Sequence, residues 1–254
     1  MSKTRYSFTT AAILLALGGT AAAEPRPDGA TRNIVIAHGA FVDGSGWRAV
    51  HDILEKDGYS VSIVQEPLTG LADDVAATKR VLDQQDGPVV LVGHSYGGSV
   101  VSVAGADPKV VRLVYVAAFQ PDVGETAGQL VAKFAAPNDA VQPAGEGYLR
   151  LDPAKFAAAF AADVPPAVAR FMAASEFPIA KASFGVPTSA AAWRTKPSYA
   201  ILTTQDHAMN PELQRWMYER SGAKVTTVAA SHAVYISQPK VVTRVIEDAA
   251  KNSK

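Results

Sequence analysis

Short apolar runs alternate with amphipathic stretches along most of this chain. The runs are rich in β-branched residues and are nearly continuous in apolar character, which favours strands buried on both faces of a parallel sheet. We predict six strands, at residues 33–37, 59–64, 89–92, 111–116, 199–203 and 224–228. Between them, apolar residues recur at helical spacing, for example Trp47, Val50, Ile53 and Leu54. This alternation predicts an α/β fold with a mostly parallel, doubly wound sheet.

The alternation stops between about residues 119 and 196. This interval is rich in alanine and proline, contains helical patterns at residues 153–162 and 166–174, and shows no convincing strand pattern. We interpret it as a helical cap that is inserted before the strand at 199–203. Its aromatic side chains either line a pocket or pack onto the sheet.

The N-terminal residues have a character of their own. A basic start, an apolar segment over residues 11–17 and three alanines at 21–23 form the pattern that a signal peptidase cleaves. The apolar segment is far shorter than the roughly 20 residues that span a bilayer. We therefore predict a signal peptide at residues 1–23 and an exported domain, periplasmic or secreted, at residues 24–254. No stable membrane insertion is expected after cleavage.

Composition narrows the possible functions. The 254 residues are 48% hydrophobic, which fits one enzyme-sized domain. Twenty-four basic residues balance 24 acidic ones, so the charge pattern gives no sign of nucleic-acid binding. The chain has no cysteine, which excludes disulfides, thiolate metal sites and cysteine nucleophiles.

One pentapeptide carries a specific chemical signal. Gly93-His94-Ser95-Tyr96-Gly97 directly follows the apolar run at residues 88–92. It has the G-x-S-x-G form of a nucleophile elbow, a sharp strand-to-helix turn that exposes a serine hydroxyl. The serine of such a turn has a positive φ, and a Cβ at either glycine would press the strand against the helix. The spacing therefore predicts Ser95 as a nucleophile.

A serine nucleophile needs a base and a group that orients the base. His232 lies in the loop between the last strand and the last helix, where a parallel sheet presents side chains at the carboxyl ends of its strands. We expect His232 to be the base, with His207 as the alternative because it also follows a strand. We expect His38 and His51 to be structural, and His94 to point away from Ser95.

The acid should precede the base in the order serine, acid, histidine. Asp206 follows the strand at residues 199–203 and meets this requirement, so it is the predicted acid. Asp122, after the strand at 111–116, is the competing candidate. The acid would hold the tautomer of the His232 imidazole and stabilise the imidazolium.

Catalysis also requires donors for a tetrahedral oxyanion. One is the backbone N–H of Tyr96, directly after the nucleophile and at the start of a helix. The other should come from the glycine-containing loop after the first strand. We predict the Ala40 N–H there, with the Phe41 N–H as the next choice.

These features together resemble a known superfamily. The His38-Gly39 loop, the elbow, Asp206 and His232 occur in the order typical of α/β-hydrolases, and the resemblance covers about residues 33–249. Within it, His38-Gly39-Ala40 with Asp43-Gly44 and Trp47 is similar to the branch of plant methyl esterases, hydroxynitrile lyases and related bacterial esterases. The resemblance implies a serine esterase that cleaves a small or medium carboxylic ester through an acyl-enzyme, with no metal or organic cofactor. A monomer is the plainest expectation, and a homodimer formed through the cap is the alternative.

Three other activities remain open at this level. The lyases of the branch use the triad as a base, but typically carry threonine in place of Gly39 and lysine directly after the histidine, where this chain has Ala233. Without that lysine, no obvious cation stabilises departing cyanide, so hydrolysis ranks above elimination. A cofactor-free perhydrolase would share the same residues. A non-catalytic binding protein would not need the complete triad.

Overall fold

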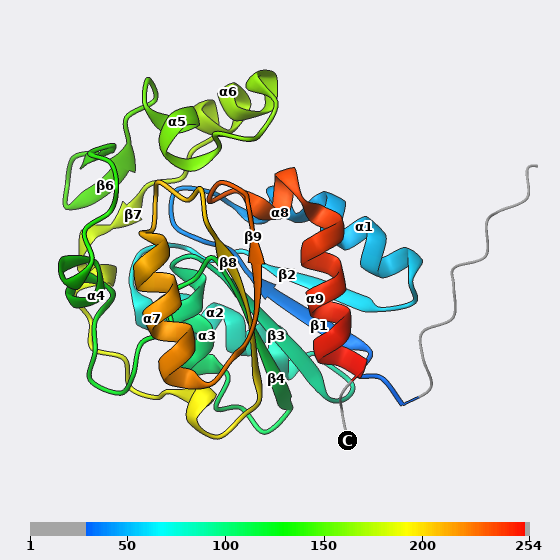
Figure 1. The fold of residues 1–254 in the computed structure, drawn as a ribbon. Helices are drawn as coiled ribbons and strands as arrows, with labels where there is room; N and C mark the ends of the chain where they lie inside the picture. The colour runs from blue at the N-terminus through cyan, green and yellow to red at the C-terminus, as the bar shows by residue number, and fades with distance from the viewer. Residues whose placement is uncertain (1–28, 252–254) are drawn as a thin grey trace, which may run out of the picture.

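The computed structural model describes residues 29–251, and its centre is a parallel sheet (Figure 1). The sheet has six strands in the order β2-β1-β3-β4-β8-β9, and each neighbouring pair runs parallel. These strands end within two residues of their predicted bounds, which confirms the α/β fold class. They are β1 (Asn33–Ala37), β2 (Ser60–Val64), β3 (Val89–His94), β4 (Val110–Val116), β8 (Ser198–Thr203) and β9 (Lys224–Val228).

Helices cover both faces of the sheet. One face carries α1 (Arg48–Lys56) and α9 (Pro239–Lys251), and the other carries α2 (Leu71–Asp83), α3 (Gly97–Ala104) and α7 (Pro211–Ser221) (Figure 1). Every residue of β1 and β3 is buried as a result. The apolar runs of β1 and β3 therefore correspond to strands with no solvent-facing side, whereas the edge strands β2 and β9 are partly exposed.

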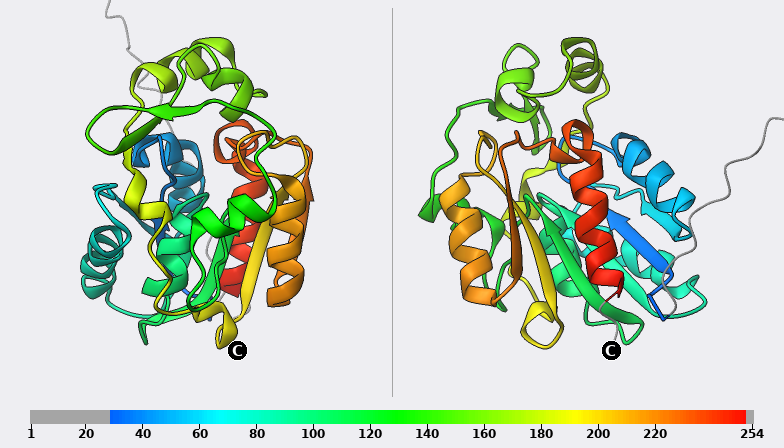
Figure 2. Two further views of the ribbon diagram at one scale, coloured as in Figure 1. Left: turned by 90° about the vertical axis from the view of Figure 1, so that its left-hand side faces the viewer. Right: turned by 45° about the vertical axis from the view of Figure 1, so that its right-hand side comes forward.

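Residues 117–197 connect β4 to β8 and form a separate layer. Its helices are α4 (Ala127–Lys133), α5 (Phe156–Phe160) and α6 (Pro166–Ala174), with short 3₁₀ turns η2 (Lys181–Phe184) and η3 (Ala192–Arg194). In Figures 1 and 2, α5 and α6 lie above the carboxyl ends of the sheet strands, while α4 lies beside α7. A side chain at those strand ends is therefore overlaid by the connecting segment.

The expectation that this interval contains no strand was wrong. It forms a three-stranded antiparallel sheet of β5 (Val141–Pro143), β6 (Tyr148–Leu151) and β7 (Ile179–Ala180), in the order β5-β6-β7. These strands are too short for an alternating pattern to be visible. The turn between β5 and β6 contains Gly145, Glu146 and Gly147, all with positive φ, so the glycine pair was the available hairpin signal.

Two short helical elements directly precede longer helices. The 3₁₀ turn η1 (Gly44–Trp47) precedes α1, and α8 (Val234–Ser237) precedes α9.

The signal peptide predicted at residues 1–23 lies outside the described residues, so the signal peptide and export stay predictions. Between residues 29 and 251, no helix combines the length and apolar content that crossing a membrane would require.

Candidate active site

The turn from β3 to α3 holds Ser95 in a left-handed conformation. Its φ is +51°, which an L side chain rarely adopts. The Ser95 N–H donates to the Val116 carbonyl at 3.2 Å, and the Ser95 carbonyl accepts from Gly98 and Phe119, each at 3.0 Å. The elbow is thus fastened to the end of β4, and the strained conformation is held by its surroundings.

The two glycines of the pentapeptide lie where no Cβ fits. A Cβ on Gly97 would lie 2.4 Å from the His38 carbonyl oxygen, and a Cβ on Gly93 would lie 2.7 Å from the Gly97 carbonyl oxygen. These are backbone atoms, so a small side-chain rearrangement cannot relieve the overlap. The glycines let the helix start approach both its own strand and the loop after β1.

His232 and Asp206 form a buried pair between two loops that follow β9 and β8. The His232 Nδ1 lies 2.7 Å from the Asp206 Oδ2, and each residue is 1% exposed. Because a carboxylate only accepts hydrogen bonds, Nδ1 carries the proton and Nε2 is left as a proton acceptor. The structure thus brings together the predicted acid and base, which are 26 positions apart.

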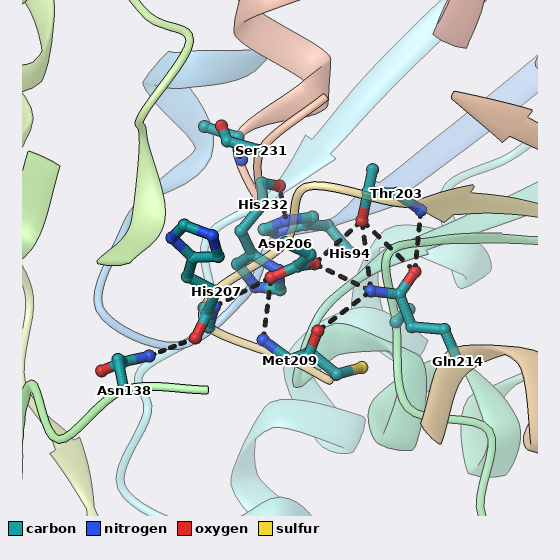
Figure 3. Close-up of polar contacts among 12 residues, drawn as sticks. His94, Asn138, Thr203, Asp206, His207, Met209, Gln214, Ser231 and His232 are labelled. Atoms are coloured by element: carbon teal, nitrogen blue, oxygen red, sulfur yellow. Dashed lines mark hydrogen bonds and ion pairs between the residues drawn. The ribbon is translucent and has the colours of Figure 1, made fainter. Parts of the chain in front are cut away.

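Asp206 is held by further donors that the sequence reasoning missed (Figure 3). Its Oδ2 also accepts from the Thr203 hydroxyl at 2.9 Å and from the Gln214 amide at 2.8 Å. Its Oδ1 accepts from the backbone N–H groups of Ala208 and Met209. A glutamine on a helix usually suggests a solvated face, and no sequence signal pointed to the buried position of Gln214.

The competing acid lies elsewhere. The carboxylate of Asp122 pairs with the guanidinium of Arg194, which lowers the pKa of Asp122. The alternative base is also displaced, because the His207 Nδ1 lies 3.1 Å from the Ala158 carbonyl and the side chain is exposed. Asp206 and His232 are therefore the acid and histidine that meet each other.

The remaining histidines are in structural positions. The Nε2 of His94 donates to the His232 carbonyl at 3.0 Å, and the two rings lie 4.7 Å apart. Burial, with the nearby His232, lowers the pKa of His94 well below its usual range, so its ring stays neutral. His94 therefore holds the loop of His232 through a hydrogen bond and through ring packing. His51 lies on α1 beside Asp52.

The predicted oxyanion donors lie around the serine. Ala40, Phe41 and Ser95 line one cavity, and Phe41 has a φ of +67°. Tyr96 directly precedes α3. Within residues 29–251, the N–H groups of Ala40, Phe41 and Tyr96 donate to no other described residue. Unpaired N–H groups suit a developing negative charge, and that of Tyr96 also lies at the start of α3.

The cavity above Ser95 is large and mostly apolar. Its volume is about 580 Å3, and both Ser95 and His232 line it. The other walls come chiefly from the segment between β4 and β8, with Asn138 and Asp139 as polar members, and no lysine or arginine is among the described lining residues. The apolar lining includes Phe119, Val131, Ala132, Ala135, Ala136, Val141, Leu149, Leu151, Phe160, Phe184 and Met209.

The segment at residues 158–163 contacts the loop of His232 directly. The Phe160 ring packs edge-on against the His232 imidazole with centroids 4.7 Å apart, and the Phe160 carbonyl accepts from the Ala233 N–H at 3.0 Å. The Ser231 hydroxyl donates to the carboxylate of Asp163. The covering layer therefore holds the loop of His232 in addition to lining the cavity.

A family model described as the alpha/beta hydrolase family matches residues 34–245. The chain belongs to the alpha/beta hydrolase family. This confirms the predicted superfamily, and the matched range contains Ser95, Asp206 and His232. No group of three His, Cys, Asp or Glu side chains able to hold a metal ion is found in the part of this hydrolase that the structure describes.

Individual relatives of this alpha/beta hydrolase carry esterase and hydrolase names. It is 29% identical to a pyrethroid hydrolase of Sphingobium wenxiniae over 254 residues, covering 86% of this chain and 87% of that protein. It is 27% identical to methylesterase 8 of Arabidopsis thaliana over 119 residues, covering 41% of this chain and 44% of the relative. The methylesterase agrees with the predicted branch.

The fold of this hydrolase also matches a solved structure. A crystal structure of the pyrethroid hydrolase PytH with BIF superposes with a TM-score of 0.75 at 25% identity, covering 87% of this chain and 98% of the other. The similarity therefore extends over nearly the whole described domain.

Proposed function

We propose that this alpha/beta hydrolase is a serine esterase with Ser95 as nucleophile, His232 as base and Asp206 as the orienting acid. The observation that carries the proposal is the buried 2.7 Å contact between His232 and Asp206, on the same cavity as Ser95. The contact fixes the imidazole tautomer that can accept a proton. The esterase and hydrolase names of its relatives support the reaction class.

The reaction proceeds in two halves. In the first, the His232 Nε2 takes the proton of the Ser95 hydroxyl while Oγ forms a bond to the ester carbonyl carbon. The carbonyl π electrons move to the oxygen, which the N–H groups of Ala40 and Tyr96 stabilise. When the intermediate collapses, the C–O bond to the alcohol breaks, His232 gives its proton to the alcohol, and the acyl group stays on Ser95.

Water completes the reaction. His232 takes a proton from the water, whose oxygen attacks the acyl carbon and forms a second tetrahedral intermediate. The bond to Ser95 then breaks, Oγ regains a proton from His232, and a carboxylic acid leaves. Asp206 keeps its charge throughout, and its five hydrogen bonds hold it in place without transferring a proton.

The cavity favours uncharged substrates. Its walls are mainly alanine, valine, leucine and phenylalanine side chains, and Asp139 at its edge is paired with Lys155. A volume of about 580 Å3 has room for an apolar ester with groups on both sides of the scissile bond. We propose esters whose acyl and alcohol groups are small to medium in size and carry no charge.

Matched variants test the assignment. We expect Ser95→Ala, His232→Ala and Asp206→Asn each to lower kcat on p-nitrophenyl butyrate by about 10⁴-fold, because each removes or neutralises a member of the triad. His207→Ala is the control for His232, and Asp122→Asn is the control for Asp206→Asn. Both controls should keep kcat within about twofold, since neither side chain contacts the triad.

Covalent labelling provides an independent readout. An alkyl fluorophosphonate should modify Ser95 with loss of fluoride, and mass spectrometry of the digested protein should locate the label on the peptide that contains Ser95. A label on another serine would refute the nucleophile. If the wild-type protein hydrolyses no ester but releases cyanide from mandelonitrile, the lyase alternative replaces the proposal.

A further inference from the structure

The side chain of Tyr96 is anchored to a neighbouring helix. Its hydroxyl donates to the Asp74 Oδ2 at 2.8 Å, and both residues are completely buried. Tyr96 lies between Ser95 and α3, whereas Asp74 lies in the first turn of α2. One hydrogen bond therefore links the residue after the nucleophile to the neighbouring helix.

Asp74 also holds the loop between β2 and α2. Its second oxygen, Oδ1, accepts from the Leu68 N–H at 2.8 Å, and Leu68 has a positive φ of 56°. The carboxylate thus joins Tyr96 to a constrained loop through two donors. Burial raises the pKa of Asp74, whereas the bonds from Tyr96 and Leu68 favour its ionised form.

The loop between β2 and α2 also contacts the segment that follows β1. The Glu66 N–H donates to the His38 Nε2 at 3.1 Å, and the His38 Nδ1 donates to the Gly39 carbonyl at 2.9 Å. Burial lowers the pKa of His38, which fits a neutral ring that accepts on one nitrogen and donates on the other. His38 and Gly39 directly precede Ala40, so residues 66–74 contact the segments that carry both oxyanion donors.

Burying the carboxylate of Asp74 at this position is energetically unfavourable. A completely buried charge carries a large desolvation penalty, and a neutral side chain could also accept a tyrosine hydroxyl. What the carboxylate adds is a stronger and more directional bond. Such a bond fixes the ring of Tyr96, and with it the direction of the adjoining backbone N–H.

We propose that Asp74 is a positioning residue for ester hydrolysis, acting through the Tyr96 hydroxyl to aim the Tyr96 N–H at the oxyanion. The proposal rests on the proposed function, because it presumes that an oxyanion forms at Ser95. Asp74 itself does not line the cavity. Its effect should therefore appear in transition-state binding and leave substrate binding nearly unchanged.

The test compares Tyr96→Phe, Asp74→Ala and Asp74→Asn with Asp73→Asn. Asp73 is the matched control, because it neighbours Asp74 on α2 but is exposed and bonds to Thr69. For Tyr96→Phe and Asp74→Ala we expect kcat on p-nitrophenyl butyrate to fall about tenfold or more, with KM within about twofold. Asp74→Asn keeps one acceptor oxygen but cannot accept from both Tyr96 and Leu68, so its loss should be smaller than that of Asp74→Ala, and Asp73→Asn should change neither constant.

A second readout separates positioning from general loosening. A short-chain alkyl trifluoromethyl ketone adds to a serine hydroxyl and forms a tetrahedral oxyanion, whereas the corresponding methyl ketone stays an uncharged planar carbonyl. The affinity of Tyr96→Phe for the trifluoromethyl ketone should fall by the same factor as kcat, and its affinity for the methyl ketone should stay nearly unchanged. This variant removes one oxygen atom, so it keeps the test valid if Asp74→Ala does not fold.

Two results would overturn the inference. One is a folded Tyr96→Phe variant with unchanged kcat and unchanged affinity for the trifluoromethyl ketone, and the other is an equal loss of affinity for the trifluoromethyl ketone and the methyl ketone. Failure of the proposed function looks different, because then the wild-type protein itself neither hydrolyses the ester nor reacts with the fluorophosphonate.

Discussion

Ser95 and Gly97 show how much of the site depends on single backbone positions. Ser95 has a φ of +51°, and Gly97 brings the start of α3 against the loop after β1. Because that loop leads to Ala40, the Gly97 contact sets the separation of the two proposed oxyanion donors. A Cβ at this position would disturb stability and geometry together.

Gly97→Ala should therefore affect activity more than folding. Its Cβ would lie 2.4 Å from the His38 carbonyl, and relief requires a backbone shift that costs about 1–3 kcal/mol. We expect a lower Tm and a fall in kcat of at least about tenfold, because the donors move apart. Gly87→Ala is the control, since the nearest atom to its Cβ would lie 3.7 Å away. Equal activity of the two variants would contradict this account.

At the scale of elements, the layer above the sheet contacts and holds the loop that carries His232. Ser231, His232 and Ala233 each contact the segment at residues 158–163, through a hydroxyl, a ring and a backbone N–H. The loop that presents His232 is thereby held from above by this segment and from below by His94. Movement of the covering layer would alter the position of the imidazole.

Ser231→Ala tests this coupling. Loss of the bond to Asp163 should lower the free energy of unfolding by about 1 kcal/mol and reduce kcat severalfold, because His232 becomes less well placed. Asp163→Asn keeps an acceptor oxygen and should retain most of the activity. Ser175→Ala removes only a hydroxyl bonded within its own helix end and serves as the control. The coupling is refuted if kcat on p-nitrophenyl butyrate is the same for Ser231→Ala and Ser175→Ala.

At the scale of the whole molecule, buried ionisable groups make stability depend on pH. Burial, reinforced by the charge of Asp74, raises the pKa of Glu66 well above its ordinary 4.5. The folded protein therefore keeps a proton that the unfolded chain releases as the pH rises above this value. The contribution of Glu66 to the free energy of unfolding therefore falls with rising pH over that range.

Glu66→Gln should remove this dependence. The amide is neutral in both states, so the Tm of the variant relative to wild type should increase from pH 5 to pH 8. Thermal unfolding of both proteins across this range measures the difference. Glu55→Gln, on the exposed side of α1, should show no comparable trend. A difference that is the same at both pH values would mean that Glu66 is ionised in the folded protein.

The sequence by itself determined the elements of the sheet and the residues that we propose to carry the chemistry. The strand bounds followed from local apolar runs, and the elbow at Ser95 followed from the glycine spacing that its positive φ requires. The positions of Asp206 and His232 after strands followed from the same local reading. The short strands β5 and β7 were not predicted, because two or three residues are too few to show an alternating pattern of apolar and polar positions.

Only the tertiary structure decided which groups meet. It placed Asp206, and not Asp122, beside His232, surrounded that carboxylate with Thr203 and Gln214, and joined Tyr96 to Asp74. The contacts of Asp206 with His232 and of Tyr96 with Asp74 join positions 26 and 22 residues apart. The physical reason is that periodicity and turn chemistry are properties of neighbouring residues, whereas burial and pairing depend on how distant segments pack together.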